Sequence, residues 1–154
     1  MKTRERIPSA AAVMCALLIG SGTSGAFAQK ADPATAIKQR IGQTYDRPGH
    51  KVDTAPVVVV GDYGLADWTQ GPKGGRALLR KANGAWEIMA CGGDGFKDAK
   101  VLKDAGIPDA TAQQLIAQLN QAERSVAPER IRQFGLFGTA DDPRMHEHPT
   151  HDHQ

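Results

Sequence analysis

The sequence predicts an α+β domain with an N-terminal helix, a four-stranded antiparallel meander and then further helices. Three observations support this order. Apolar residues recur every four positions early in the chain, four β-rich runs separated by short turns follow, and helical spacing returns near residue 97. We expect the helices to pack on one face of the sheet, which could curl as in a cystatin-like roll.

The first helix is expected to begin at Asp32-Pro33, because aspartate is a good N-cap and proline suits the first helical position. Pro48-Gly49 should end this helix, and residues 49–55 should form a polar connection. The apolar stripe of the helix consists of Ile37, Ile41 and Tyr45.

Four strands should follow, and the turns between them define the meander. The glycine-rich residues 71–75 are typical of a flexible loop, whereas Asn83-Gly84 strongly favours a two-residue hairpin. The expected strands cover residues 57–60, 63–69, 76–81 and 85–91.

The Asn83-Gly84 turn also predicts the register of its hairpin, with Ala82 opposite Ala85. Side chains alternate along a strand, so one face should belong to the core and the other should be mixed and partly open. The expected pairs are Arg80–Glu87, Leu79–Ile88 and Leu78–Met89. The core face would hold Ala77, Leu79, Trp86, Ile88 and Ala90, and the mixed face Arg76, Leu78, Arg80, Glu87, Met89 and Cys91. Trp68 is likewise expected in the core.

Beyond the sheet, the glycines of residues 92–95 should end the last strand. A short helix over residues 97–105 should be closed by Gly106. Asp109 or Thr111 should cap a longer helix that runs to Arg124, and Pro128 should start a last helical turn or two through Phe134. The stripe of the longer helix is Leu115, Ile116, Leu119 and Ala122.

Residues 1–28 have the pattern of a secretory signal peptide. Basic residues precede an apolar stretch over residues 10–19, and Ala26-Phe27-Ala28 matches an A-x-A cleavage site. We therefore expect cleavage after Ala28 and a periplasmic or secreted protein. The apolar stretch is too short for a membrane anchor, and no other segment suggests a membrane span in the mature chain.

The charge balance argues against a nucleic-acid partner. The predicted signal peptide contains three basic residues and one acidic residue, so the rest of the chain has 16 of each sign and a formal net charge of zero. It also keeps one cysteine, Cys91, which excludes an intramolecular disulfide. We expect a single folded domain over residues 29–138 and a flexible tail over residues 139–154.

Four of the five histidines lie within residues 145–153, which we call the histidine segment. Imidazole is a common metal ligand, and a flexible chain without rigid geometry would follow intrinsic affinity, which places copper first among the divalent ions considered. Methionine adds a soft ligand for cuprous copper. The alternative is a solvated polar tail. The predicted copper ligands are Met145, His146, His148, His151 and His153.

Cys91 is a further candidate ligand. It ends a predicted strand on the same face as Met89, and a thiolate with a thioether suits cuprous copper. The alternative interpretation is a small buried hydrophobic residue, since free cysteine is among the most buried residue types.

Several segments resemble the copper uptake system-associated proteins, which are small exported bacterial proteins. The resemblance covers roughly residues 35–137, and its most specific parts are residues 66–71 (ADWTQG) and 74–80 (GGRALLR). Residues 57–62, 84–88 and 91–92 also contribute. The resemblance implies an accessory part in copper acquisition and strengthens the choice of copper. It implies no catalytic set.

The sequence thus predicts a non-enzymatic, exported copper-binding accessory protein, with a copper transporter or a copper chaperone as its partner. No Ser/His/Asp or Cys/His arrangement suggests catalysis. The alternative is a binding module that holds a small organic ligand in the hollow of the sheet, with an incidental tail.

Overall fold

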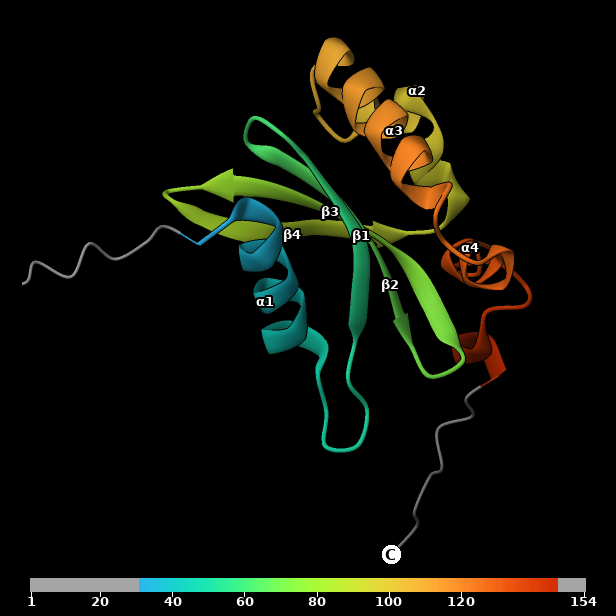
Figure 1. Cartoon of the computed structure of the whole chain (residues 1–154). Coiled ribbons are helices and arrows are strands. Elements are labelled where there is room, and N and C mark those ends of the chain that lie inside the picture. The colour runs from blue at the N-terminus through green and yellow to red at the C-terminus, as the bar shows by residue number, and fades with distance from the viewer. Residues whose placement is uncertain (1–30, 147–154) are drawn as a thin grey trace, which may run out of the picture.

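The computed structural model describes residues 31–146 and has the α+β order that the sequence predicts. The predicted signal peptide therefore lies outside the described residues. The elements are α1 (Pro33–Tyr45), β1 (Asp53–Val60), β2 (Tyr63–Gln70), β3 (Lys73–Ala82), β4 (Ala85–Gly92), the 3₁₀ turn η1 (Asp94–Lys97), α2 (Ala99–Asp104), α3 (Asp109–Glu123), α4 (Pro128–Phe134) and the 3₁₀ turn η2 (Pro143–His146). The four strands form one antiparallel sheet in the order β1-β2-β3-β4 (Figure 1).

Helix α1 begins where the sequence predicts. The side chain of Asp32 accepts a hydrogen bond from the backbone N–H of Thr35, which satisfies one of the free donors at the helix start. The helix ends at Tyr45, before Pro48-Gly49, and β1 begins at Asp53, so the polar connection covers residues 46–52 and lies three residues earlier than expected. Ile37 and Ile41 are buried, whereas Tyr45 is 39% exposed.

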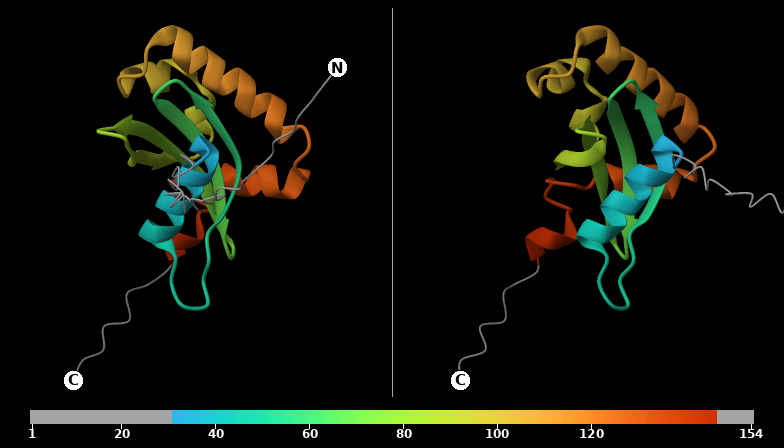
Figure 2. Two further views of the ribbon diagram at one scale, coloured as in Figure 1. Left: turned by 60° about the vertical axis from the view of Figure 1, so that its left-hand side comes forward. Right: turned by 90° about the vertical axis from the view of Figure 1, so that its left-hand side faces the viewer.

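Helices cover both faces of the sheet, which corrects the expectation of a single covered face. The C-terminal helices α2 and α3 do pack together on one face, but α1 lies on the opposite face (Figures 1 and 2). The core is therefore divided by the sheet. One half contains Val58, Leu65, Leu78, Phe96, Leu102, Leu115 and Leu119, and the other contains Ile37, Ile41, Ala66, Ala77, Leu79 and Trp86.

The predicted hairpin register holds for its first half and then changes at a β-bulge. Ala82 pairs with Ala85, Arg80 with Glu87, and Leu79 with Ile88, as expected. The next pair is Leu78 with Ala90, so the predicted pairing of Leu78 with Met89 is wrong. One extra residue in β4 shifts every later side chain relative to β3.

The face that the sequence predicts to be mixed and partly open is closed at one end and open at the other, where Arg80, Glu87 and Met89 are exposed. Leu78 and Arg76 are completely buried at the closed end, because η1, α2 and α3 cover this side of the sheet. Cys91, beyond the bulge, pairs with Ala77 and packs at the border of the core half that contains α1. Its predicted position on the Arg76 face is therefore wrong.

Of the residues predicted to form a loop, Gly71 and Pro72 form the β2–β3 turn, whereas Gly74 and Gly75 belong to β3. A Cβ on Gly74 would lie 2.4 Å from the carbonyl oxygen of Gln133, and one on Gly75 would lie 2.7 Å from the indole of Trp68. These positions need glycine because α4 and the Trp68 ring approach the backbone closely. The hairpin is held to α4 by Gln133, whose side-chain amide donates to the carbonyls of Gly71 and Lys73 at 2.7 and 2.9 Å.

The C-terminal helices follow the predicted order, with one difference at a cap. Gly106 has a φ of +92° directly after α2, as expected for a helix-closing glycine. The N-cap of α3 is Pro108, whereas the sequence suggested Asp109 or Thr111. Within residues 31–146, no helix has the length and apolar character needed to cross a membrane.

Candidate functional site

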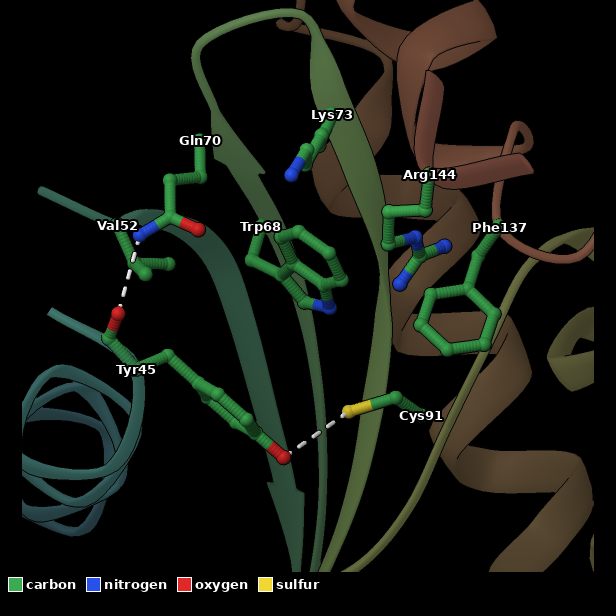
Figure 3. A pocket seen from close by; sticks show the side chains of 8 residues that line it. All are labelled: Tyr45, Val52, Trp68, Gln70, Lys73, Cys91, Phe137 and Arg144. Atoms are coloured by element: carbon green, nitrogen blue, oxygen red, sulfur yellow. Dashed lines mark hydrogen bonds between the residues drawn. The ribbon is translucent and has the colours of Figure 1, made fainter. Parts of the chain in front are cut away.

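A cavity of about 300 Å³ lies between the end of α1, the sheet and the segment that follows α4 (Figure 3). Its walls combine aromatic and cationic side chains, and none of the lining residues is an aspartate, glutamate or histidine. We call it the Trp68 pocket. Its lining residues are Tyr45, Val52, Trp68, Gln70, Lys73, Cys91, Phe137 and Arg144.

Two aromatic rings form the walls of the Trp68 pocket. The indole of Trp68 rests on Gly75, and the ring of Phe137 meets it edge to face, with centroids 6.1 Å apart and planes at 85°. Trp68 is partly buried and packs against the core half that contains α1, at its border, while Trp86 is buried within that half as predicted. The Nε1–H of Trp68 is buried and has no acceptor among residues 31–146.

Arg144 enters the pocket from η2 and is held by an ion pair. Its Nε and Nη2 donate to the carboxylate of Asp142, whose side chain is only 4% exposed. The guanidinium lies 3.6 Å from the centroid of the Phe137 ring and 5.8 Å from that of Trp68. Hydrogen bonds from Arg144 hold the pKa of Asp142 well below its usual range.

These contacts fold residues 139–146 onto the domain. Asp142 also accepts hydrogen bonds from the backbone N–H groups of Gly138 and Arg144, so the turn after α4 closes on itself. The sequence placed these residues in a flexible tail that begins at residue 139. The ordered chain instead continues to η2, because a buried carboxylate and an aromatic-stacked arginine anchor it.

Cys91 and Tyr45 line the pocket on the side opposite Arg144. The thiol Sγ and the phenol oxygen are 3.8 Å apart, and burial raises the pKa of both groups. Both groups are therefore neutral at neutral pH. A neutral thiol without a neighbouring base is a poor nucleophile and a poor metal ligand.

Gln70 fixes the mouth of the pocket. Its side-chain amide donates to the carbonyl of Tyr45 at 3.0 Å and to that of His50 at 2.9 Å. It thereby joins the end of α1 and the turn that follows it to the end of β2. His50, which lies outside the histidine segment, takes part in this contact through its backbone carbonyl.

The predicted metal ligands are only partly within the described chain. Met145 is 70% exposed, and a ring nitrogen of His146 lies 3.1 Å from the carbonyl oxygen of Ala140. His148, His151 and His153 lie outside the described residues. Within residues 31–146, no three His, Cys, Asp or Glu side chains are grouped so that they could hold a metal ion.

Cys91 lines a groove together with Met89, and neither Met145 nor His146 lines that groove. That groove lies next to the Trp68 pocket and also borders Tyr45 and Phe137. Met89 is 36% exposed, whereas Cys91 is half-buried. The two residues therefore border one groove, although the bulge has moved Cys91 to the α1 side.

A second charged group lies buried on the other face of the sheet, around Arg76. This guanidinium is fully buried and contacts three carboxylates: Asp67 at 3.2 Å, Asp94 at 2.7 Å and Glu123 at 2.8 Å. Lys97 adds a second cation by pairing with Glu123. We call these five residues the Arg76 cluster.

The Arg76 cluster contains two cations and three carboxyl groups, and one of the carboxyl groups is kept protonated. Burial raises the pKa of Asp67 to about 8, and the negative charge of Glu123 acts in the same direction, against the opposing charge of Arg76. Neither oxygen of Asp67 has a hydrogen-bond donor among residues 31–146. Burial alone would raise the pKa of Glu123, but hydrogen bonds from Lys97 and Arg76 outweigh it and lower that pKa. The cluster is therefore electrically balanced at neutral pH.

The sequence did not predict the Trp68 pocket or the Arg76 cluster, although several of their residues lie in the two segments that carry the family resemblance. Residues 66–71 and 74–80 supply Asp67, Trp68, Gln70 and Arg76. One feature of the sequence could have indicated the Arg76 cluster: Asp67 and Arg76 lie inside apolar strands, where a buried charge needs a partner. Their partners Glu123, Phe137 and Arg144 lie far along the chain, and no local pattern links them.

No family model matches this chain, and comparison with curated proteins and with solved structures gave no significant match. The resemblance to the copper uptake system-associated proteins therefore stays a prediction.

Proposed function

We propose that this chain is an exported, non-enzymatic copper-binding accessory protein that presents copper to a transporter or a chaperone. One observation carries the proposal: four histidines and a methionine fall within nine residues at the C-terminal end. In this proposal, copper is cargo that the histidine segment captures, and the folded domain serves as its carrier.

The position of the first two ligands supports this reading. Met145 is well exposed, and His146 makes one contact with a backbone carbonyl that a metal ion could replace. Neutral imidazole and thioether groups suit copper in both of its common oxidation states. Because the segment directly follows Arg144, captured copper would lie close to the folded surface that a partner protein contacts.

Copper titration of a histidine-substituted protein tests this proposal. The substitutions His146→Gln, His148→Gln, His151→Gln and His153→Gln keep the chain length, and His50→Gln is the matched control outside the segment. Calorimetry and native mass spectrometry with cupric ions should show loss of most binding in the quadruple variant and none in the control. Binding should also weaken below about pH 6, where imidazole is protonated. Unchanged copper affinity in the quadruple variant would refute the proposal.

The Trp68 pocket supports a second candidate function, that of a small-molecule binding module. Its volume of about 300 Å³ is at the lower end of the range for small-ligand sites, and its walls are mostly apolar with a few directed polar groups. In this candidate, the ligand occupies the pocket and the histidine segment is incidental. Ligand binding that survives deletion of residues 145–154 would favour it over the copper proposal.

A further inference from the structure

The size of the Trp68 pocket limits what it can hold. A volume of about 300 Å³ corresponds to roughly ten water molecules in the liquid. A molecule with a single ring and a short polar substituent fits such a space.

The shape of the pocket favours a flat, apolar body. Trp68 and Phe137 meet at nearly a right angle, so a planar ring that stacks on one of them presents its edge or its face to the other. Tyr45 adds a third aromatic side chain at the opposite side (Figure 3).

The charge of the pocket favours an anionic substituent. Two cations, Lys73 and Arg144, line the pocket, and none of its lining residues is a carboxylate. Figure 3 shows both side chains directed towards the space beside Trp68. The neutral Tyr45 and Cys91 add no negative charge that would oppose an anion.

Arg144 is preorganised to receive a carboxylate. Asp142 occupies its Nε and Nη2 and thereby fixes the plane of the guanidinium, while Nη1 has no acceptor among residues 31–146. The Nε1–H of Trp68 also has no acceptor there, and Figure 3 shows it directed between Arg144 and Cys91. The indole N–H is buried, whereas Nη1 of Arg144 belongs to a side chain that lines the cavity and is 30% exposed. A carboxylate oxygen is the acceptor that suits this donor.

We propose that the Trp68 pocket binds a small monocyclic aromatic carboxylate, with its ring against the aromatic side chains of the wall and its carboxylate at Arg144 and Lys73. This inference rests on the second candidate function and is independent of copper. It names the class of ligand for a pocket that the first proposal leaves unused.

A matched pair of probes tests the proposal. Phenylacetate has the ring and the charge, and phenylacetamide has nearly the same shape without the charge. The indole N–H signal of Trp68 in NMR spectra of the isotope-labelled protein reports occupancy directly. We expect phenylacetate to shift this signal in a saturable way and to bind at least tenfold more tightly than the amide.

Three variants separate charge recognition from a general effect on the fold. Lys73→Met and Arg144→Met should each weaken phenylacetate binding by tenfold or more, while Lys103→Met, which removes a cation on the distant helix α2, should leave it unchanged. Equal binding of the acid and the amide would overturn the ligand class and leave the binding-module candidate standing. No saturable shift with either probe at millimolar concentration would overturn both.

Discussion

Two arginines of this protein are paired with carboxylates in opposite ways. Arg76 is fully buried within the sheet and contacts three carboxyl groups, two of which accept hydrogen bonds from its Nη1 and Nη2. The side chain of Arg144 is 30% exposed, pairs with the single carboxylate of Asp142 and stacks on an aromatic ring above a cavity. The guanidinium of Arg76 is enclosed by the fold, whereas the guanidinium of Arg144 has one edge that a ligand could contact.

The difference shows how the same residue type serves structure in one place and recognition in another. A buried guanidinium must have all its partners from the chain itself, because water cannot replace them. A guanidinium at a cavity wall needs only enough partners to fix its direction, and a ligand can supply the rest.

The largest expected effect is that of removing the sealed arginine. Arg76→Met should lower the free energy of unfolding by about 3–5 kcal/mol, because it leaves the carboxylate of Glu123 buried and short of a partner. The matched control is Arg80→Met on the same strand. Its side chain is 51% exposed and its nearest carboxylate, Glu87, is 3.5 Å away, so the change should stay within about 0.5 kcal/mol. Urea denaturation of both variants measures the difference. Equal effects would contradict the assignment of Arg76 as the structural arginine.

The next effect is a pH dependence that comes from the Arg76 cluster. Because the pKa of Asp67 is raised to about 8 in the folded state, the folded protein holds a proton that the unfolded chain releases near pH 4. Stability should therefore fall as pH rises from about 5 to about 8, by at most about 1.4 kcal/mol per pH unit, and become level above that range.

The substitution Asp67→Asn should remove this slope, since an amide does not titrate. Urea midpoints at several pH values between 5 and 9 provide the measurement for both proteins. The lowered pKa values of Glu123 and Asp142 act in the opposite direction, but only at more acidic pH, where those groups take up protons. A slope that persists unchanged in the variant would show that Asp67 is ionised in the fold.

The smallest expected effect on stability is that of the open arginine. Arg144→Met should lower the free energy of unfolding by about 1–2 kcal/mol, less than Arg76→Met, because the buried carboxylate of Asp142 keeps its hydrogen bonds from the backbone N–H groups of Gly138 and Arg144. The contribution of this pair is present at neutral pH and is lost on acidification, as Asp142 becomes protonated. Arg132→Met, on the exposed surface of α4, is the matched control. A loss as large as that of Arg76→Met would mean that Arg144 is structural as well.

Much of the fold could be predicted from local patterns. The Asp32 cap, the stripe of Ile37 and Ile41 and the Asn83-Gly84 hairpin each depend on residues that are neighbours along the chain. The pairing of Leu79 with Ile88 followed from the turn alone. The bulge near Met89 could not be predicted in this way, because an added residue in a strand leaves no mark in an alternating pattern that is already mixed.

The chain's sequence by itself determined its helices and its four strands, because capping and alternation are local properties. Only the tertiary structure decided that Arg76 is sealed by Glu123, that α1 covers the second face, and that Arg144 reaches Trp68 across the sheet. The physical reason is that a buried charge or an aromatic wall is completed by residues far apart in sequence, and folding alone brings them within a few ångströms of one another.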